Sequence, residues 1–253
     1  MVSEDIDRLT GLARRDQWSI EELDWAGLEA GGLPVELRQA IADVCAQLLH
    51  GEKTAHGAAA RLVTTFSSPA ARAFCALQER DEARHVAFFE RVISLTGCAG
   101  RVRPSTERLM AEVDRAREPE EIVLGMHILV EAIAHSSFIE AGRLVADVEP
   151  TGPMGFLKPI AGDWLPRLLA RDESRHIAFG VQYLRACVPE LEPSARHRLE
   201  AHLERWGAWL LESVRDPDLL VGVGFDAAAL GSQLLEDLNL RIGQVGLSTR
   251  IRL

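Results

Sequence analysis

The chain repeats one pattern of glutamate and histidine residues, and this repeat constrains its fold more than any other feature. The segment at 52–56 (EKTAH) recurs at 131–135 (EAIAH), and the segment at 81–88 (DEARHVAF) recurs at 172–179 (DESRHIAF). The second pair of segments lies further apart in the chain than the first pair, so the second half holds extra residues between its two motifs. Such a repeat predicts two similar helix pairs that present the same groups inward and are related by a pseudo-two-fold axis.

The repeated glutamates and histidines have the spacing of metal ligands on helices. Glu82 and His85 are three residues apart and therefore share a helix face, as do Glu173 and His176. A glutamate on each preceding helix can complete the set. The predicted metal ligands and catalytic centre are thus Glu52, Glu82, His85, Glu131, Glu173 and His176. Four buried carboxylates would be very costly without compensation, whereas two divalent ions balance their charge.

The donor types also narrow the choice of metal. Oxygen-rich coordination with one imidazole per ion suits iron or manganese better than zinc, which prefers fewer ligands in a tetrahedral arrangement. Glu140 competes with Glu131 for a place in the site, because its separation from Glu173 is close to that between Glu52 and Glu82. The repeat favours Glu131, so we expect Glu140 on the surface or at a channel mouth.

Other polar residues are expected around the ligands. A metal-bound imidazole usually donates its second N–H to a partner such as a carboxylate, and we expect Asp81 to serve His176 and Asp172 to serve His85. Three further histidines lie one helical turn from a predicted ligand and are expected to border the site without binding metal: His56, His127 and His135. The only tyrosine, Tyr183, follows His176 by seven residues, and both a core role and a redox role are open for it.

The rest of the sequence predicts an all-α protein. Stretches rich in Ala, Leu, Glu and Arg are separated by Pro and Gly, and the alternation typical of β-strands is almost absent. Three Pro and three Gly between 149 and 162 predict a long loop, with Asp163 capping the next helix. We expect helices at about 19–27, 34–66, 68–96, 105–117, 119–147, 163–188, 194–214 and 226–245. We expect one domain over 1–253, with the metal-binding bundle at about 34–188 and additional helices at about 190–246.

Charge and composition argue against several classes of function. The formal net charge is -10, and no Lys/Arg run is concentrated enough to predict binding to nucleic acid or to a membrane surface. The segment Met1–Ala30 carries charges throughout, and no stretch has the pattern of a signal peptide or a membrane span, so we expect a cytoplasmic protein. The four cysteines are scattered without a Cys-x-x-Cys pair, which indicates neither a zinc site nor a disulfide framework.

A glutamate on one helix and Glu-x-x-His on the next, repeated once, resembles the ferritin-like di-iron carboxylate family. Within that family, the Asp-Glu-x-Arg-His form is similar to the small subunit of ribonucleotide reductase, its ligand-binding oxidase relatives and bacterial di-iron monooxygenases. The resemblance covers about residues 35 to 190. It implies a ferritin-like four-helix bundle with additional N- and C-terminal helices, in which the six ligands hold two iron ions, or one manganese and one iron.

For function, the resemblance implies an oxidoreductase, an oxygenase or oxidase that activates dioxygen. It would hydroxylate, N-oxygenate, desaturate or cleave a small, largely apolar substrate, with electrons from a separate reductase or ferredoxin, and a homodimer is expected. The reductase subunit has its radical tyrosine one turn after the first Glu-x-x-His histidine, where this chain has Phe89, which argues against a reductase role. The alternatives are a radical-generating or ligand-binding subunit with two metals, and a non-catalytic helical bundle.

Overall fold

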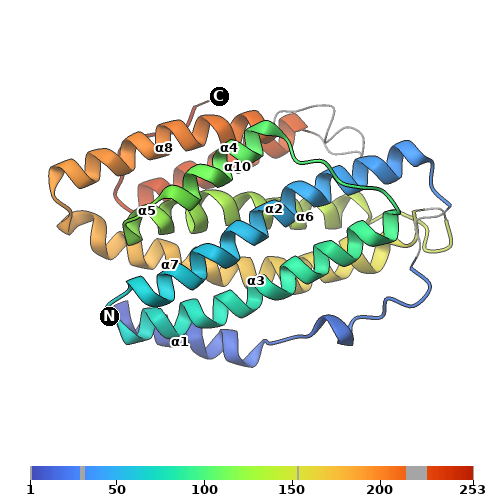
Figure 1. The fold of residues 1–253 in the computed structure, drawn as a ribbon, viewed down its shortest axis with the longest axis horizontal. Helices are drawn as coiled ribbons and strands as arrows, with labels where there is room; N and C mark the ends of the chain where they lie inside the picture. The colour runs from blue at the N-terminus through green and yellow to red at the C-terminus, as the bar shows by residue number, and fades with distance from the viewer. Residues whose placement is uncertain (1, 29–31, 153, 215–226, 253) are drawn as a thin grey trace.

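The structure is a computed structural model that describes residues 2–28, 32–152, 154–214 and 227–252. All regular elements in these ranges are helical, which confirms the all-α prediction. In chain order they are α1 (Val2–Arg15), η1 (Ile20–Glu22), α2 (Val35–Thr65), α3 (Pro69–Thr96), α4 (Pro104–Arg115), α5 (Pro119–Val123), η2 (Leu124–Val130), α6 (Glu131–Leu144), η3 (Lys158–Leu169), α7 (Ala170–Cys187), η4 (Val188–Glu190), α8 (Pro193–Val214) and α10 (Ala227–Gln244). Figure 1 shows the long helices running along the length of the molecule.

The first repeated helix pair, α2 and α3, is continuous α-helix close to the predicted bounds. Ser68 accepts a hydrogen bond from the backbone N–H of Ala71, and Pro69 takes the first helical position, so α3 begins where the sequence predicts. It ends at Gly97, whose φ of 64° lies in the left-handed region that glycine adopts readily. The two helices pack against each other along most of their length.

The second repeated pair differs from the prediction because it contains two π-helical segments. The continuous helix expected at 119–147 consists of α5, the π-helical η2 and then α6. A second π-helical segment, η3, runs directly into α7. The two segments end immediately before the turns that carry Glu131 and Glu173. π-helical turns are rare and occur frequently at functional sites, and both of these lie next to predicted ligands.

The loop predicted at 149–162 is wrong in its last part, since η3 begins at Lys158. Asp163 consequently lies inside η3 and caps no helix. Gly162 serves close packing rather than a turn, because a Cβ there would lie 3.3 Å from Cγ2 of Val145 at the end of α6. The Pro and Gly residues of this stretch therefore predicted a loop that is longer than the one in the structure.

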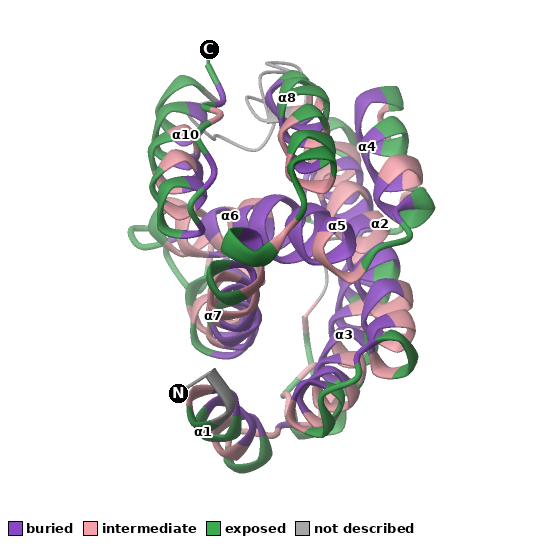
Figure 2. Cartoon of the chain, turned by 90° about the vertical axis from the view of Figure 1, so that its left-hand side faces the viewer, coloured by how far each residue is buried: buried purple, intermediate pink, exposed green. Residues whose placement is uncertain are grey.

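The N-terminal segment contains a helix that was not predicted from the sequence. α1 covers 2–15, whereas the helix predicted at 19–27 is reduced to the short 3-10 turn η1. The apolar face of α1 is buried and is formed by Ile6, Leu9 and Ala13. This face packs against both α3 and α7, below which α1 lies in Figure 2.

The remaining helices form a layer on the opposite side of the repeated pairs. Figure 2 shows α4, α8 and α10 there, with α6 between them and α7. The stretch Pro119–Leu144 is long and apolar enough by composition to cross a membrane, but 78% of its most apolar window is buried in the bundle. Its apolar residues thus serve the protein core. The predicted start of the last helix, Asp226, lies outside the described residues.

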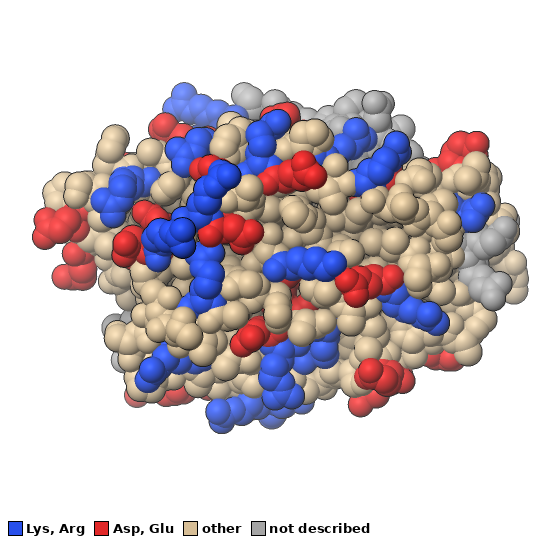
Figure 3. Space-filling model, in the orientation of Figure 1, with Lys and Arg blue, Asp and Glu red and all other residues tan. Residues whose placement is uncertain are grey.

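Charged side chains cover the face shown in Figure 3 in a mixed pattern. Basic and acidic groups lie next to each other there, and the described residues on this face form no extended patch of one sign. Exposed pairs such as Lys53 and Glu90 (Nζ to Oε1 2.9 Å) join neighbouring helices. Each exposed pair of this kind contributes at most about 1 kcal/mol, so the fold depends mainly on its apolar core.

Candidate metal centre

Six side chains from four helices meet inside the bundle, and all are at most 3% exposed. They are Glu52 on α2, Glu82 and His85 on α3, Glu131 on α6, and Glu173 and His176 on α7. Two groups of donor atoms could each hold a metal ion, with the atoms of a group within 4.8 Å of one another. The first group is Glu52, Glu82, His85 and Glu173; the second is Glu82, Glu131 and His176. The structure therefore brings together all six predicted ligands.

Each histidine of the cluster directs Nδ1 toward the carboxylates. His85 Nδ1 lies 3.1 Å from Glu173 Oε1 and 3.3 Å from Glu52 Oε2. His176 Nδ1 lies 3.1 Å from Glu82 Oε1. Nδ1 is therefore the ring atom that each histidine would use to bind a metal ion.

The other ring nitrogen of each histidine faces an aspartate from the opposite helix pair. His176 Nε2 lies 3.3 Å from Asp81 Oδ2, and His85 Nε2 lies 3.5 Å from Asp172 Oδ2. Both aspartates are fully buried. A carboxylate in this place fixes the orientation of the ring and leaves Nδ1 available to a metal ion. The two partnerships are those expected from the motif.

Residues 16–18, which follow α1, contact the same aspartates from outside, and we call them the N-terminal strap. Trp18 Nε1 donates a hydrogen bond to Asp172 Oδ2 (2.8 Å), and Gln17 Nε2 donates one to Asp81 Oδ1 (3.2 Å). Neither residue was predicted from the sequence, since neither has a helical spacing to the repeated motif. The strap ties the N-terminal segment to both helix pairs.

Two arginines of the repeated motif neutralise the aspartates. Arg84 Nη2 lies 2.5 Å from Asp81 Oδ1, and Arg175 forms the equivalent ion pair with Asp172. Burial alone would raise the pKa of both aspartates, but hydrogen bonds from the histidines and the charge of the arginines hold it below the usual value. Arg175 Nη1 also lies 3.4 Å from Asp16 Oδ2, so Asp16 of the strap contacts this group of arginines and aspartates.

Protons balance part of the charge of the cluster when no metal ion is bound. Burial raises the pKa of Glu52 and Glu131 well above the usual value for glutamate. Burial opposes charge on His85 and His176 as well, but the surrounding carboxylates raise the pKa of both imidazoles well above the usual value. Burial also acts to raise the pKa of Glu82, but the two histidines outweigh this effect and lower its pKa below the usual value. Bound cations would displace these protons.

The donor atoms fit a pair of divalent metal ions. Several of them are buried without a hydrogen-bond partner among the described residues, which is costly for charged oxygens. These atoms are Glu52 Oε1, Glu82 Oε2, Glu131 Oε2, both carboxylate oxygens of Glu173, and His176 Nδ1. Two cations would satisfy them and balance the four carboxylates, and the oxygen-rich donor set matches iron or manganese.

Gln78, one turn before Glu82 on α3, is a further residue that was not predicted from the sequence. Its Nε2 donates hydrogen bonds to Glu131 Oε1 (2.6 Å) and to Glu82 Oε1 (3.2 Å), and its Oε1 lies 3.0 Å from His127 Nε2. The four-residue spacing from Glu82 was the available signal. His127 thus borders the cluster through Gln78. Burial and the nearby charge of His176 lower the pKa of His127 to about 3, so its ring is neutral near pH 7.

The remaining candidates contribute no donor atom to either group of ligands. His56 and His135 are half-buried, and burial lowers the pKa of His135. Glu140 pairs with Arg143 (Oε2 to Nη1 3.0 Å) and lies outside the cluster. Tyr183 belongs to an aromatic group on α7 that reaches the cluster only through other rings, and burial raises the pKa of its hydroxyl.

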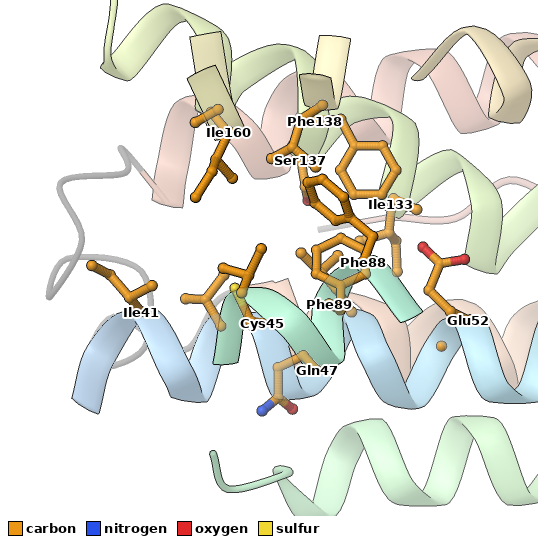
Figure 4. A pocket seen from close by; sticks show the side chains of 18 of the residues that line it. Ile41, Cys45, Gln47, Glu52, Phe88, Phe89, Ile133, Ser137, Phe138 and Ile160 are labelled. Carbon is orange, nitrogen blue, oxygen red and sulfur yellow. The ribbon is translucent and has the colours of Figure 1, made fainter. Parts of the chain in front are cut away.

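An apolar cavity of about 450 Å³ reaches the carboxylates, and Glu52, Glu131 and Glu173 form part of its wall. The rest of the wall is mostly apolar. Figure 4 shows Glu52 at one end of a row of side chains that continues along α2 to Cys45 and Ile41. Glu52 lies three helical turns beyond Ile41, which corresponds to about 16 Å of helix. The cavity therefore extends well beyond the metal-binding cluster.

No family model matches the sequence, and no curated protein matches it. Among solved structures, R2-like ligand-binding oxidases with reconstituted Mn/Fe cofactor have a similar fold. A variant with aerobically reconstituted cofactor gives a TM-score of 0.75 at 18% identity, and the match covers 94% of this chain and 92% of that chain. A structure obtained after a long soak gives a TM-score of 0.69 at 20% identity and covers 98% and 94%.

These similarities confirm the fold that the repeated motif implied. The chain has a ferritin-like helical-bundle fold similar to that of those oxidases. The expected additional C-terminal helices are present as α8 and α10, and a helix also precedes the repeated pairs, but it is α1 rather than the one predicted at 19–27.

Proposed function

We propose that this chain is an oxidoreductase in which two metal ions, either two iron or one manganese and one iron, activate dioxygen to oxidise a small, largely apolar substrate. One observation carries the proposal: Glu52, Glu131 and Glu173 belong both to the buried metal-binding cluster and to the wall of the apolar cavity. A molecule in the cavity lies against the metal-binding carboxylates. Solved structures of the same fold are oxidases with Mn/Fe cofactor, which supports the proposal.

The residues around the site have separate tasks. When bound, a reduced pair of iron or manganese ions would supply electrons to dioxygen. The six ligands hold the pair. Asp81 accepts a hydrogen bond from His176 Nε2, and Asp172 lies 3.5 Å from His85 Nε2, so each carboxylate helps to orient a ring. Burial of the ligands keeps bulk water away from the reacting atoms.

The cavity wall indicates the class of substrate. Phe88, Phe89 and Phe138 form aromatic contacts beside Glu52, with centroids 5.4 Å apart for the first two rings and 5.8 Å apart for the last two. Pockets of about 300–1,000 Å³ hold drug-sized ligands, and this cavity falls within that range. A mainly hydrocarbon or aromatic molecule with few polar groups fits such a wall. Hydroxylation, N-oxygenation, desaturation and cleavage are the reactions that we propose for it.

The proposed reaction needs electrons from outside the chain. In hydroxylation, N-oxygenation and desaturation the substrate supplies only half of the electrons that full reduction of dioxygen requires, whereas a cleavage that incorporates both oxygen atoms takes all of them from the substrate. We therefore propose a separate reductase or ferredoxin as the donor. We also propose that the protein acts in the cytoplasm as a homodimer, and light scattering after size-exclusion chromatography measures the oligomeric state.

Dioxygen uptake tests the proposed function. Metal-free protein is loaded anaerobically with Fe(II), or with Mn(II) and Fe(II), and then mixed with aerated buffer. We expect two metal ions per chain and uptake above that of the same free metal in buffer. Glu173→Ala removes a ligand that lines the cavity and is expected to abolish uptake, whereas Glu140→Ala, outside the cluster, is the control. Wild type that holds two metal ions and consumes no dioxygen would overturn the proposal.

One observation favours a second candidate, a radical-generating subunit. Rings connect Tyr183 to His176: the centroids of Tyr183 and Phe179 are 6.4 Å apart, those of Phe179 and Phe74 are 4.5 Å apart, and those of Phe74 and His176 are 6.3 Å apart. A tyrosyl radical detected by EPR after reaction with dioxygen, and absent in Tyr183→Phe, would support this candidate. The cavity at the carboxylates has no role in such a subunit, so we prefer the oxidase. A chain that binds no metal would instead be a ligand-binding bundle.

A further inference from the structure

Three positions around the metal centre break the symmetry between the two halves of the chain. The repeat relates Glu52 to Glu131 on the first helix of each pair, and Glu82 to Glu173 on the second. The same offsets relate His127 to Leu48, and relate Gln78 to Leu169 and Gly180 to Phe89. Two polar side chains and a glycine therefore occur on one side of the cluster, where the other side has only apolar side chains.

Gln78 links two of the metal-binding carboxylates. Its side chain is 1% exposed, and its Nε2 donates to Oε1 of Glu131 and to Oε1 of Glu82. One oxygen of each carboxylate is thus held by the protein itself. The shorter of the two bonds, at 2.6 Å, goes to Glu131.

His127 and Gly180 hold the amide of Gln78 in this orientation. A carboxamide can present either its oxygen or its NH₂ group. Here Oε1 faces Nε2 of His127 at 3.0 Å, so the NH₂ group faces the carboxylates. The ring of His127 can reach this place because residue 180 is glycine: a Cβ there would lie 2.4 Å from Cβ of His127. The three residues act as one unit.

The opposite side of the cluster has apolar side chains in place of this unit. Leu48 and Leu169 belong to one apolar cluster, and Leu48 also lines the cavity. Oε1 of Glu52 and both carboxylate oxygens of Glu173 have no hydrogen-bond partner among the described residues. Both carboxylates line the cavity, as Glu131 does, but neither accepts a hydrogen bond from a side chain equivalent to Gln78.

We infer that Gln78 is a positioning residue that makes the two metal positions unequal, so that the position formed by Glu82, Glu131 and His176 binds its ion first and more tightly. The inference rests on the proposed function in one respect, namely that the cluster holds two metal ions. A carboxylate already held in place loses less conformational freedom when an ion arrives. The other position, formed by Glu52, Glu82, His85 and Glu173, is then filled second.

Stepwise metal binding tests the inference without any use of activity. Chelator-treated full-length protein is titrated anaerobically with Mn(II) in a calorimeter, and EPR spectra are recorded at one Mn(II) per chain. For the wild type we expect two steps whose dissociation constants differ by about 10-fold or more. At one Mn(II) per chain we expect the spectrum of isolated ions rather than of coupled pairs.

Gln78→Leu is the decisive variant, because it introduces the residue found at the equivalent position, Leu169. It is expected to weaken the tighter step by about 10- to 100-fold, the usual effect of removing an outer hydrogen-bond partner of a metal ligand. The weaker step is expected to change less, because Glu82 is the one ligand of that position to which Gln78 donates a hydrogen bond, so coupled pairs become visible at one Mn(II) per chain.

Two further variants separate positioning from a general loss of structure. His127→Leu keeps Gln78 but removes the group that orients its amide, so it is expected to weaken the tighter step by a smaller factor, and it tests the inference even if Gln78→Leu does not fold. Leu169→Val removes a buried methylene without touching a hydrogen bond and is expected to leave both steps unchanged.

The outcomes distinguish this inference from the proposed function. Equal affinities in the wild type, or unchanged steps in both Gln78→Leu and His127→Leu, would overturn the inference while two bound ions still support the proposed function. A wild type that binds no Mn(II) and no Fe(II) would overturn both.

Discussion

Trp18 Nε1 donates a hydrogen bond of 2.8 Å to Asp172 Oδ2, although 154 residues separate the two in the chain. The same carboxylate oxygen lies 3.5 Å from Nε2 of His85. The ring of Trp18 also stacks on that of His85, with an interplanar angle of 22°. The N-terminal strap therefore supports a metal-binding imidazole through the aspartate that orients it.

Trp18→Phe is expected to lower both stability and metal affinity. The substitution keeps an aromatic ring but removes the donor, so a buried carboxylate oxygen loses a partner, which costs about 1–3 kcal/mol. The ring of His85 becomes less firmly oriented, so we expect metal affinity to fall by about 10-fold. Urea unfolding of the metal-free protein and titration with Mn(II) measure the two effects.

Trp25→Phe is the matched control for that experiment. Trp25 Nε1 donates a hydrogen bond of the same kind to the backbone oxygen of Ile20 (2.9 Å), outside the metal centre. We expect some loss of stability and unchanged metal affinity. Wild-type metal affinity in Trp18→Phe would show that the strap does not support the ligand.

Metal binding is expected to release protons. In the metal-free protein the carboxylates raise the pKa of His85 and His176, although burial opposes this, and burial raises the pKa of Glu52 and Glu131. Metal ligands must be neutral imidazoles and ionised carboxylates, so affinity falls as the pH decreases. Calorimetric titrations with Mn(II) in buffers of different ionisation enthalpy count the protons. Heats that are identical in all buffers would contradict the prediction.

His127 is expected to make the metal-free protein less stable at lower pH. Its pKa is about 3 in the folded protein and about 6.5 in the unfolded chain. Only the unfolded chain takes up the proton between these values, so stability is lost as the pH falls below about 6.5, by at most about 1.4 kcal/mol per pH unit. Between about pH 6 and about pH 5, we expect the free energy of unfolding of His127→Gln to fall by about 1 kcal/mol less than that of the wild type.

Urea unfolding at the two pH values measures the difference in the His127 experiment. His197→Gln is the control for the loss of a histidine as such, because His197 is exposed on α8 and lies away from the metal centre. A wild-type slope in His127→Gln would show that the buried ring does take up a proton.

Gly180→Ala is expected to destabilise the protein and to disturb the metal centre. The new methyl group would lie 2.4 Å from Cβ of His127, and overpacking of this kind costs about 1–3 kcal/mol. Gly57→Ala is the matched control on α2, since a Cβ there meets nothing within 4 Å, and it is expected to be neutral or to stabilise by about 0.5–1 kcal/mol. Thermal unfolding ranks the two variants, and equal melting temperatures would contradict the expected clash.

Cys45→Phe is expected to block the apolar cavity while metal binding persists. Cys45 lines the cavity between Glu52 and Ile41 (Figure 4), and an added aromatic ring fills much of the space there. We expect affinity for a neutral naphthalene-based fluorescent probe to fall by about 10-fold or more, equivalent to about 1.4 kcal/mol. Cys98→Phe, outside the cavity wall, is the control, and fluorescence titration is the measurement. Unchanged probe binding in Cys45→Phe would place the ligand elsewhere.

The meeting of the six ligands could be predicted because the signal is local and occurs twice. Glu82 and His85 share a helix face by spacing alone, and the second copy fixes how the two pairs face each other. The crossing of Asp81 and Asp172 to the opposite histidines follows from the same symmetry. Gln17 and Trp18 could not be found in this way, because their contacts join residues 64 and 154 positions apart with no repeated spacing.

The helices also differ in how well nearby residues in the sequence predict them. The bounds of α3 follow from Ser68, Pro69 and Gly97, which act within one turn of the helix ends. The two π-helical segments were not predicted, although η3 contains Pro166, which cannot donate a hydrogen bond inside a regular α-helix. α1 is different, since its buried residues Ile6, Leu9 and Ala13 have the spacing of an amphipathic helix, which is a local signal in the sequence.

The crossing of each aspartate to the histidine of the other half has a consequence for biosynthesis. A nascent chain that has released only α2 and α3 from the ribosome contains Glu82 and His85 but still lacks Asp172, so the imidazole has no partner to orient it. We therefore expect iron to be captured only after α7 has docked. Loading would then follow the assembly of both helix pairs, which protects an incompletely folded chain from the damage that loosely held iron causes in the presence of oxygen.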